Sequence, residues 1–459
     1  MCIGSPGEGS RARPWLLFAA GEGVFLGIAV LPDARRHLAA YVLLFLAGSL
    51  LSLVAARSLS ASDGRFLIFC AAAFRLTLLF RPPDLSEDVL RYLWDGRVAA
   101  SGRSPYGLAP ADPRAAGISS GLQNRLARPE LRTVYPPVAE AAFRVVASVP
   151  GGGIVAMKTL FSLADVAVVV LLLASGGAGA RFGAALYAFH PLPVTETAGQ
   201  GHLDALGVAL LLASVVYVSR RRPLAAGIAF AAAVLVKYVP LAASAPLARR
   251  GKLWFAAAAI AVGAAVWGLA AQAGVSPAVG LGPLATRWEF NSLLYPAVSA
   301  TVETAEIPQK AKAAYIRWKE EREHRLWMQD VFPYFYSAFF ARALLGIFLI
   351  AALVTIAVTV KDLELALFAS IATLLLVSPT LHPWYLLWVL PFAAKRREPA
   401  FVYLCTAAPL AYGLLYPLRG WTPLAIRVAE YGPFAALLGW TLLRSQRPHP
   451  APLPGGESH

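Results

Sequence analysis

The residues best suited to chemistry lie in one short acidic run near the front of the chain. From residue 84 to residue 97 the sequence reads DLSEDVLRYLWDGR, and four of these side chains are carboxylates. Acid is scarce elsewhere, because only 26 of the 459 residues are Asp or Glu and 58% are hydrophobic. A carboxylate in such apolar surroundings costs free energy unless it binds or reacts with something. The run is therefore the first candidate for a functional site.

The four carboxylates are not equivalent. Asp84 and Glu87 have the spacing of a capping box, which gives both a structural role at the start of a helix. Asp95 lies one helical turn after Arg91 and can form an ion pair with it. Asp88 has neither role, so it is the first candidate for a catalytic base, and Asp84 is the second. A solvated helix face is the alternative for all four.

The acidic run is also expected to form an amphipathic helix that begins at Asp84. Leu85, Val89 and Leu93 recur every four residues and form an apolar stripe, while the charged residues form a polar one. This pattern is typical of a helix that lies along a membrane surface. The helix is thus expected to hold its carboxylates at the edge of the lipid.

The rest of the composition indicates an integral membrane protein. Apolar windows of about 20 residues recur along the chain, and each is long enough to cross ~30 Å of hydrocarbon. Net charge is 41 − 26 = +15, but the basic residues form short clusters between apolar windows. Such clusters are typical of topology signals rather than of a nucleic-acid surface. Two of the three cysteines lie inside apolar windows, which argues against a disulfide framework.

We expect an all-α fold with about 12 transmembrane helices, one re-entrant segment and juxtamembrane helices on the outer face. Arg11 and Arg13 resemble the charged front of a signal peptide, but the apolar stretch after them is longer than usual, so a retained first helix is expected. The expected spans are Trp15–Leu31, Leu38–Ala55, Phe66–Phe80, Ile154–Ala174, Phe182–Val194, Ala205–Val218, Leu253–Ala271, Tyr336–Val360, Leu363–Val377, Trp384–Ala394, Phe401–Leu418 and Thr422–Leu443.

Charge predicts how these spans are oriented. With the amino terminus inside, three spans place the loop 82–153 outside, and the loop 273–335 is also outside. Basic clusters flank Leu224–Leu247 on both sides, so this segment is expected to turn back near Lys237 rather than cross. Arg35 and Arg36 violate the positive-inside rule, because they lie outside in this arrangement. The resulting modules are residues 1–81, 82–153, 154–272, 273–335 and 336–459, the last with a cytoplasmic tail.

Several polar residues fall at the outer ends of the expected spans. Glu196 sits among apolar residues and is expected to face a cavity, because a buried acid needs a partner. His202 and Asp204 are two residues apart at the head of a helix. They can be a capping aspartate with its orienting histidine, a pair that binds sugar hydroxyls, or two metal ligands. No third ligand has matching spacing, so no metal site is predicted.

Lys237 is a candidate for binding an anion such as a phosphate, and a late histidine lies beside aromatic residues. Lys237 follows an arginine cluster by about 15 residues, so a helix would carry it roughly 20 Å into the membrane, where it must meet an anion or a carbonyl. Snorkelling or pairing with an acid is the alternative. His382 precedes Trp384 and Tyr385, a grouping that also suits an interfacial anchor.

The second outer loop and two aromatic–proline motifs complete the candidates. Tyr106 follows Pro105, and Tyr135 precedes two prolines; such clusters fix a chain path or seat a sugar ring or prenyl chain. The outer loop contains the segment 287–291 and a helix-like run, Gln309–Met328, rich in basic and aromatic residues. A surface helix on anionic lipid is expected for this run, with carrier or acceptor binding as the alternative.

Four motifs in this order resemble one family. The first is D-x₆-R-Y-x-W-D-G-R-x₄-G-x-S-P-Y followed by Y-P-P; the others are PVTETAGQGHLDA, KYVPL and SPTLHPWY. Together they resemble the GT-C glycosyltransferases that use polyprenyl-phosphate sugars. The chain is most similar to the bacterial polyprenyl-phosphate-mannose-dependent mannosyltransferases, including glycosyltransferase family 87. The resemblance extends from Asp84 to Pro391.

The resemblance implies a GT-C-type bundle with its active site on the extracytoplasmic face of the cell membrane. It implies that Asp88, or else Asp84, is the catalytic base and that His382 lies near the donor phosphate. Lys237 and, more weakly, Arg91 are further candidates for that phosphate. Glu196, His202, Asp204 and the four aromatic residues Tyr106, Tyr135, Trp384 and Tyr385 are candidates for binding substrate.

The expected activity is therefore an inverting single displacement. One base suffices because a phosphate is already a good leaving group, whereas a glycosidase needs a second carboxylate at a set separation. The expected partners are a polyprenyl-phosphate sugar, a glycolipid or polysaccharide acceptor and membrane lipids, with no nucleic acid. No cofactor is indicated, and a divalent metal is left open. A lipid-linked sugar transporter and a non-catalytic partner of a membrane polymerase are the rival functions.

Overall fold

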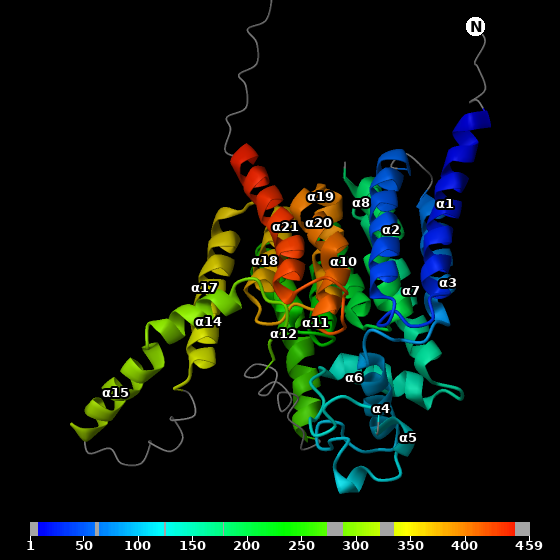
Figure 1. Ribbon diagram of the computed structural model, residues 1–459. Helices are drawn as coiled ribbons and strands as arrows, with labels where there is room; N and C mark the ends of the chain where they lie inside the picture. The colour runs from blue at the N-terminus through cyan, green and yellow to red at the C-terminus, as the bar shows by residue number, and fades with distance from the viewer. Residues whose placement is uncertain are drawn as a thin grey trace, which may run out of the picture.

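The computed structural model describes residues 8–59, 64–123, 125–177, 179–272, 288–321 and 335–445. The molecule is 76% helix, and the described residues contain no strand, as the sequence predicts. A single isolated bridge joins Phe290 to Thr380. Figure 1 shows a bundle of roughly parallel helices with a smaller lobe, formed by α4, α5 and α6, at one end. The start of α1 and the end of α21 lie at the other end.

The elements follow one another along the chain without long-range strand pairing. In order they are α1 (Glu8–Ala29), α2 (Leu38–Leu59), α3 (Gly64–Leu79), α4 (Asp88–Ala100), η1 (Pro113–Ala115), α5 (Ser120–Gln123), α6 (Pro137–Ser148), α7 (Ile154–Ala174), α8 (Ala180–Phe189), α9 (Pro191–Pro193), η2 (Val194–Gly199), α10 (Asp204–Ser219), α11 (Pro223–Val234), η3 (Val239–Ala243), α12 (Ser244–Gln272), α14 (Tyr295–Thr304), α15 (Ile307–Glu320), α17 (Ser337–Thr359), α18 (Leu363–Val377), η6 (Pro383–Trp388), α19 (Leu390–Arg396), α20 (Pro399–Ala407), η7 (Ala408–Leu414) and α21 (Pro423–Ser445).

Four helical stretches are long and apolar enough to cross a membrane: Leu38–Leu59, Ile154–Ala174, Val239–Gly268 and Ser337–Thr359. Four further apolar helices have 10 to 17 residues, which is short for a span. The molecule is therefore a helical membrane protein, and the expected count of about 12 spans stays a prediction.

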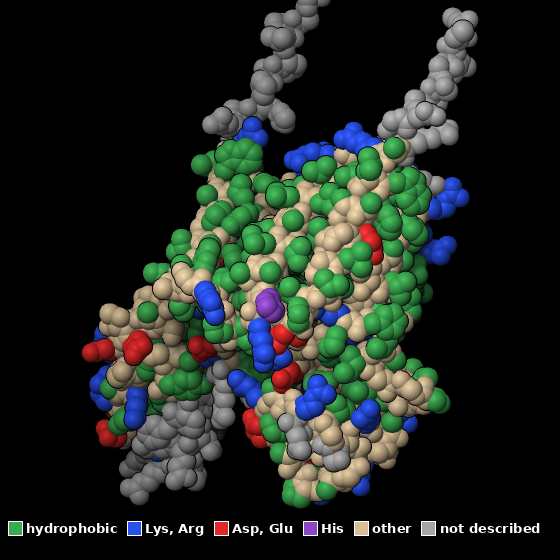
Figure 2. Space-filling view, turned by 45° about the vertical axis from the view of Figure 1, so that its right-hand side comes forward, with side chains coloured by type: hydrophobic (Ala, Val, Ile, Leu, Met, Phe, Trp, Pro, Cys, Tyr) green, Lys and Arg blue, Asp and Glu red, His purple; other side chains and the backbone are tan. Residues whose placement is uncertain are grey.

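Basic side chains cap helices at the end of the bundle that is remote from the lobe. Arg220 donates to the carbonyl oxygen of Ala174 at the end of α7, and Arg249 donates to that of Val360 just after α17. Lys395 forms an ion pair with Glu364 at 2.5 Å. Positive charge at helix carboxyl ends is favourable because of the helix dipole. Figure 2 shows Lys and Arg side chains gathered at this end.

The chain turns back where the charge pattern predicts. Arg220 and Arg249 both lie at the capped end of the bundle, whereas Lys237, between them, contacts Asp204 at the opposite end of α10. The turn includes the short helix η3, whose second residue is Pro240. The segment after α11 therefore brings Lys237 to the lobe end of the bundle, and the chain then returns to the opposite end.

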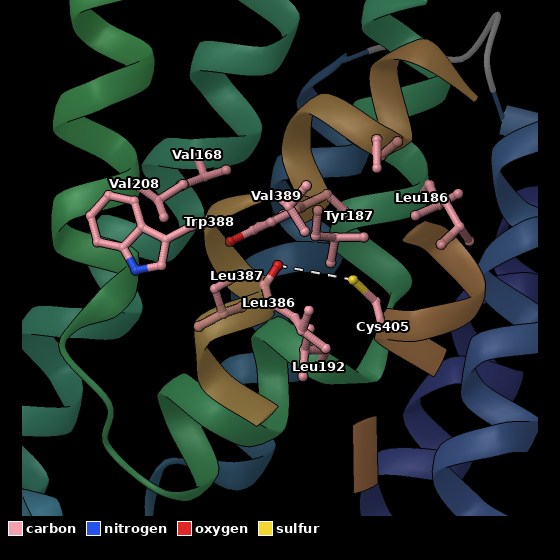
Figure 3. Packing of buried hydrophobic residues seen from close by; sticks show 14 of the residues in the cluster. Val168, Leu186, Tyr187, Leu192, Val208, Leu386, Leu387, Trp388, Val389 and Cys405 are labelled. Carbon is pink, nitrogen blue, oxygen red and sulfur yellow. Dashed lines mark hydrogen bonds between the residues drawn. The ribbon is translucent and has the colours of Figure 1, made fainter. Parts of the chain in front are cut away.

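Trp388 packs at the centre of the bundle, fully buried beside Val208 and Val168 (Figure 3). A Cβ atom at Gly207 of α10 would lie 2.3 Å from the Trp388 ring, so only glycine allows this approach. Figure 3 also shows Cys405, whose thiol lies 3.9 Å from the Leu386 carbonyl oxygen. Packing at Gly207 thus fixes η6 against α10, and both elements carry site residues.

Candidate functional site

The acidic run forms a helix, but a buried one. α4 begins at Asp88, and Tyr92 stacks on Phe143 of α6 with ring centroids 4.7 Å apart. Gly96 allows the two helices to touch, because a Cβ there would lie 2.4 Å from the Phe143 carbonyl oxygen. Leu90 and Trp94, on the other side of α4, are buried in the lobe. Protein covers both faces of α4, and its predicted place along a membrane surface stays a prediction.

Asp84 has a structural role that differs from the predicted one. It forms an ion pair with Arg81 and accepts the backbone N–H of Ala34 at 2.7 Å. Gln200 donates to its carboxylate at 3.1 Å and accepts the Asp84 N–H in return. The capping box is absent, because α4 starts four residues later and Glu87, at its N-cap, makes no side-chain capping bond. Asp84 does not line the cavity described next.

A cavity of about 500 Å³ lies where the lobe meets the bundle. The walls come from segments far apart in the sequence: Glu87, Asp88, Arg91, Leu126, Ala127, Arg128, Leu131, Arg132, Val134, Tyr135, Pro136, Lys237, Tyr238, Trp288, Glu289, Phe290, Thr380, His382, Trp384, Tyr385 and Leu415. This volume and mixed lining are typical of a small-molecule site.

Asp88 lies in this wall, and its carboxylate accepts no hydrogen bond from any described residue. Its side chain is 38% exposed and lines the cavity. Burial raises the pKa of Asp88 to about 6. Two cations lower it and two carboxylates raise it, in the order of effect Lys237, Asp204, Arg91 and Glu87. A carboxylate with such a pKa is suited to accept a proton near neutral pH.

Lys237 lies in the wall but already has a partner. Its Nζ is 2.7 Å from Oδ1 of Asp204 and 4.2 Å from the centre of the Tyr385 ring. Trp388 donates its indole N–H to the same Asp204 oxygen at 2.6 Å. Asp204 is fully buried and does not line the cavity. Of the alternatives for Lys237, the structure shows pairing with an acid, and phosphate binding stays a prediction.

Arg91 forms the predicted ion pair and keeps one free donor. Its Nε is 3.0 Å from both carboxylate oxygens of Asp95, and its Nη1 donates to the Leu131 carbonyl at 2.9 Å. Its Nη2 is buried without a hydrogen-bond partner among the described residues, although Arg91 lines the cavity. A buried donor without a partner is unfavourable, so Nη2 is available to an anionic ligand.

His382 belongs to a stack of four parallel rings that starts at Phe290. Phe290 lies on His382 at 4.5 Å, His382 on Trp384 at 4.3 Å, and Trp384 on His202 at 3.8 Å. Burial lowers the pKa of His382 to about 3, so the ring is neutral. Its Nδ1 is buried without a partner. The stack carries two predicted histidines, of which His382 lines the cavity and His202 does not.

His202 and Glu196 lie behind Asp88. Nδ1 of His202 is 3.6 Å from Oδ2 of Asp88, and Nε2 is 3.5 Å from Oε2 of Glu196. Glu196 accepts the Tyr412 hydroxyl at 3.0 and 2.9 Å to its two oxygens. The prediction that Glu196 faces the cavity is wrong: it is fully buried and paired with a tyrosine.

The aromatic candidates divide in the same way. Tyr135, Trp384 and Tyr385 line the cavity, whereas Tyr106 does not. Tyr106 instead donates its hydroxyl to the Tyr135 carbonyl at 2.9 Å, which holds the loop that carries Tyr135. This hydrogen bond fits the alternative in which Tyr106 fixes the path of the chain.

Two basic residues of the wall, Arg128 and Arg132, were not among the sequence candidates, whereas Trp288 belongs to the segment 287–291 singled out in the second outer loop. Arg128 has a left-handed backbone with φ of 54°, and its guanidinium lies 5.2 Å from the centre of the Trp288 ring. Among the described residues neither arginine has a carboxylate partner. The only signal was the basic pair itself, because no spacing rule links residue 128 to residue 288.

Two further predictions are tested only in part. Arg287 lies outside the described residues, as does the segment 322–328 of the run Gln309–Met328. The remainder of that run belongs to α15, which projects away from the bundle in Figure 1.

In the described part of the chain no group of three or more His, Cys, Asp or Glu side chains could hold a metal ion.

Comparison with known proteins gives one match. The family model described as alpha-(1->6)-mannopyranosyltransferase, N-terminal domain, matches residues 19–250, which is 250 − 18 = 232 of the 459 residues. The match includes Asp88, His202, Asp204 and Lys237 but not His382. No curated protein matches the chain, and no solved structure does.

Proposed function

Because the chain belongs to the alpha-(1->6)-mannopyranosyltransferase family, we propose that it transfers mannose from a polyprenyl-phosphate carrier to a hydroxyl group of a glycolipid or glycan. One observation carries the proposal: Asp88, a carboxylate with a pKa near neutrality, faces a cavity of about 500 Å³ that also presents Arg91, Lys237 and His382. Displacement of a phosphate by a hydroxyl is helped by one base at the hydroxyl and by cations and hydrogen-bond donors at the phosphate.

In the proposed reaction the acceptor oxygen attacks C1 of the mannose from the side opposite the phosphate. The new C1–O bond forms as the bond from C1 to the phosphate oxygen breaks, and that electron pair leaves with the polyprenyl phosphate. Asp88 takes the proton of the acceptor hydroxyl. A β-linked donor then gives an α-mannoside, so the reaction inverts the anomeric carbon. No second carboxylate is required, in contrast to glycoside hydrolysis.

Arg91 and His382 are proposed to bind the phosphate through the nitrogens that lack partners in the protein. Lys237 would add its charge from the wall, while Asp204 keeps it in place. Arg128 and Arg132 add positive charge without a carboxylate partner among the described residues. Cations fixed where charge develops on the leaving group stabilise the transition state.

The cavity is proposed to open on the extracytoplasmic side of the cell membrane. The opposite end of the bundle carries the basic residues that cap helices, and the positive-inside rule assigns such an end to the cytoplasm. Reporter fusions at Ser119 in the lobe and at Arg221 after α10 test this arrangement. Opposite compartments support it, and a common compartment contradicts it.

The activity is tested with the purified full chain and radiolabelled donors. We expect transfer from polyprenyl-phosphate mannose, little from the glucose or arabinose carriers, and none from GDP-mannose. Parallel reactions with a chelator test metal dependence. Nuclear magnetic resonance of the product distinguishes the anomers. Transfer from GDP-mannose alone, or retention of the donor anomer, would refute the proposed reaction.

A further inference from the structure

His202 occupies a position from which it can control Asp88. Its imidazole lies between two carboxyl groups, with Nδ1 3.6 Å from Oδ2 of Asp88 and Nε2 3.5 Å from Oε2 of Glu196. Both nitrogens are buried and have no hydrogen-bond partner at the present distances. Both contacts are slightly longer than the roughly 2.7–3.2 Å of a hydrogen bond. Catalytic hydrogen bonds are often long in an empty site and shorten when substrate binds.

The local fold holds His202 against α4. The preceding turn, η2, is a π-helix, a form of helix that is frequent at functional sites. Gly201 follows with φ of +83°, and a Cβ there would lie 2.9 Å from the Val89 side chain. Glycine is thus needed both for the backbone conformation and for the close approach. On its face, His202 stacks on Trp384 at 3.8 Å.

The protonation states of the three groups fit one arrangement. Burial, with smaller effects from Lys237 and His382, lowers the pKa of His202 well below its usual value, so the ring is neutral and carries one N–H. Burial raises the pKa of Glu196 to about 8, although the Tyr412 hydroxyl lowers it, so Glu196 is protonated at neutral pH. A protonated Glu196 can donate to Nε2, and the single imidazole N–H is then on Nδ1, facing Asp88.

We propose that His202 is a positioning residue that donates its Nδ1–H to Oδ2 of Asp88, and that Glu196 sets the tautomer by donating to Nε2. This inference rests on the proposed role of Asp88 as the base. The bond would fix one carboxylate oxygen and leave the other to accept the acceptor proton. The bond would also favour the ionised form of Asp88. The other charged groups that face Asp88 act in both directions: Lys237 and Arg91 favour its ionised form, and Asp204 and Glu87 disfavour it.

Two variants of His202 separate this role from simple stacking. His202→Phe keeps a ring against Trp384 but has no donor, whereas His202→Asn lacks the ring but can place an amide N–H near the Nδ1 position. We expect His202→Phe to lower kcat at least about tenfold with little change in donor KM. The acid limb of its pH profile should move to higher pH, because Asp88 loses a donor. His202→Asn should retain more activity than His202→Phe. The reverse order would overturn the proposal.

Glu196 supplies a second, independent test. Glu196→Gln keeps a donor for Nε2, and Glu196→Leu does not. We expect Glu196→Gln to remain close to the wild type and Glu196→Leu to show the loss and pH shift of His202→Phe. Equal kcat and unshifted pH profiles in both variants would overturn the assignment, and thermal unfolding reports whether each variant is folded.

Asp88→Asn distinguishes the failure of this inference from failure of the proposed function. If the wild type transfers no mannose, the proposed function itself fails, and if Asp88→Asn transfers mannose normally, the role of Asp88 as the base fails. If Asp88→Asn is inactive while His202→Phe matches the wild type in kcat and pH profile, only the positioning role fails.

Discussion

Lys237 and Asp204 form an ion pair beside the cavity, with Nζ 2.7 Å from Oδ1. The lysine comes from the turn after α11 and the aspartate from the first turn of α10, two helices that pack against each other. Asp204 is fully buried, and its second oxygen has no partner. The aspartate therefore depends on this lysine for its counter-charge.

Removing the lysine is expected to cost stability as well as activity. Lys237→Met leaves a buried carboxylate unpaired, which should destabilise the protein by about 3 kcal/mol. The double variant Lys237→Met with Asp204→Asn should regain most of that stability but little transfer. Thermal unfolding in detergent and the transfer assay measure the two effects. A single variant as stable as the wild type would show that the pair is not structurally important.

Asp84 and Asp88 should respond in opposite ways to the same substitution. Asp84→Asn weakens the ion pair with Arg81 and the contact with Ala34, so it should lower the free energy of unfolding by roughly 1.5–3 kcal/mol. Protein that remains folded should still transfer mannose. Asp88→Asn should leave unfolding unchanged. If Asp84→Asn abolished transfer without lowering the free energy of unfolding, the roles assigned to Asp84 and Asp88 would be reversed.

The pH profile should report the raised pKa of Asp88. A base works only when it is deprotonated, and burial raises this pKa from 3.8 to about 6. We therefore expect kcat to be highest near pH 7, below the Glu196 pKa of about 8, and to fall about tenfold per unit below pH 6. Measuring kcat with saturating donor between about pH 4.5 and 8.5 tests this. An acid limb that begins only near the ordinary value of 3.8 would contradict it.

Gly207 should be intolerant of any side chain. Gly207→Ala places a Cβ 2.3 Å from the Trp388 ring and should displace the indole that donates to Asp204. Overpacking of this kind costs about 1–3 kcal/mol. Gly346→Ala, in the middle of α17 with open space around it, is the matched control and should be neutral or slightly stabilising. Equal thermal midpoints for the two variants would argue against tight packing at Trp388.

Sequence patterns predicted the contacts that depend on local spacing. The pair between Arg91 and Asp95 follows from one helical turn, and the structure has it at 3.0 Å. The motifs around Lys237 and His382 also meet Asp88 at one cavity, although they are far apart in the chain. Their place at the ends of apolar windows made this convergence predictable.

Contacts between distant segments could not be predicted in the same way. Asp84 has a capping residue's spacing, yet its partner Gln200 lies 116 residues later. Trp288 reaches the wall because the bridge from Phe290 to Thr380 ties its loop there. No single-sequence pattern specifies such pairs, because they result from packing of the whole chain.

The most direct test of the account compares Asp88→Asn with Glu87→Gln in mannosyl transfer from polyprenyl-phosphate mannose. Both residues line the cavity, are adjacent in the chain and lose one negative charge on substitution. The account predicts that Asp88→Asn lowers kcat by about 10²–10⁴-fold and that Glu87→Gln changes it little. Substantial activity in Asp88→Asn, or an equal loss in both variants, would contradict the role of Asp88 as the base.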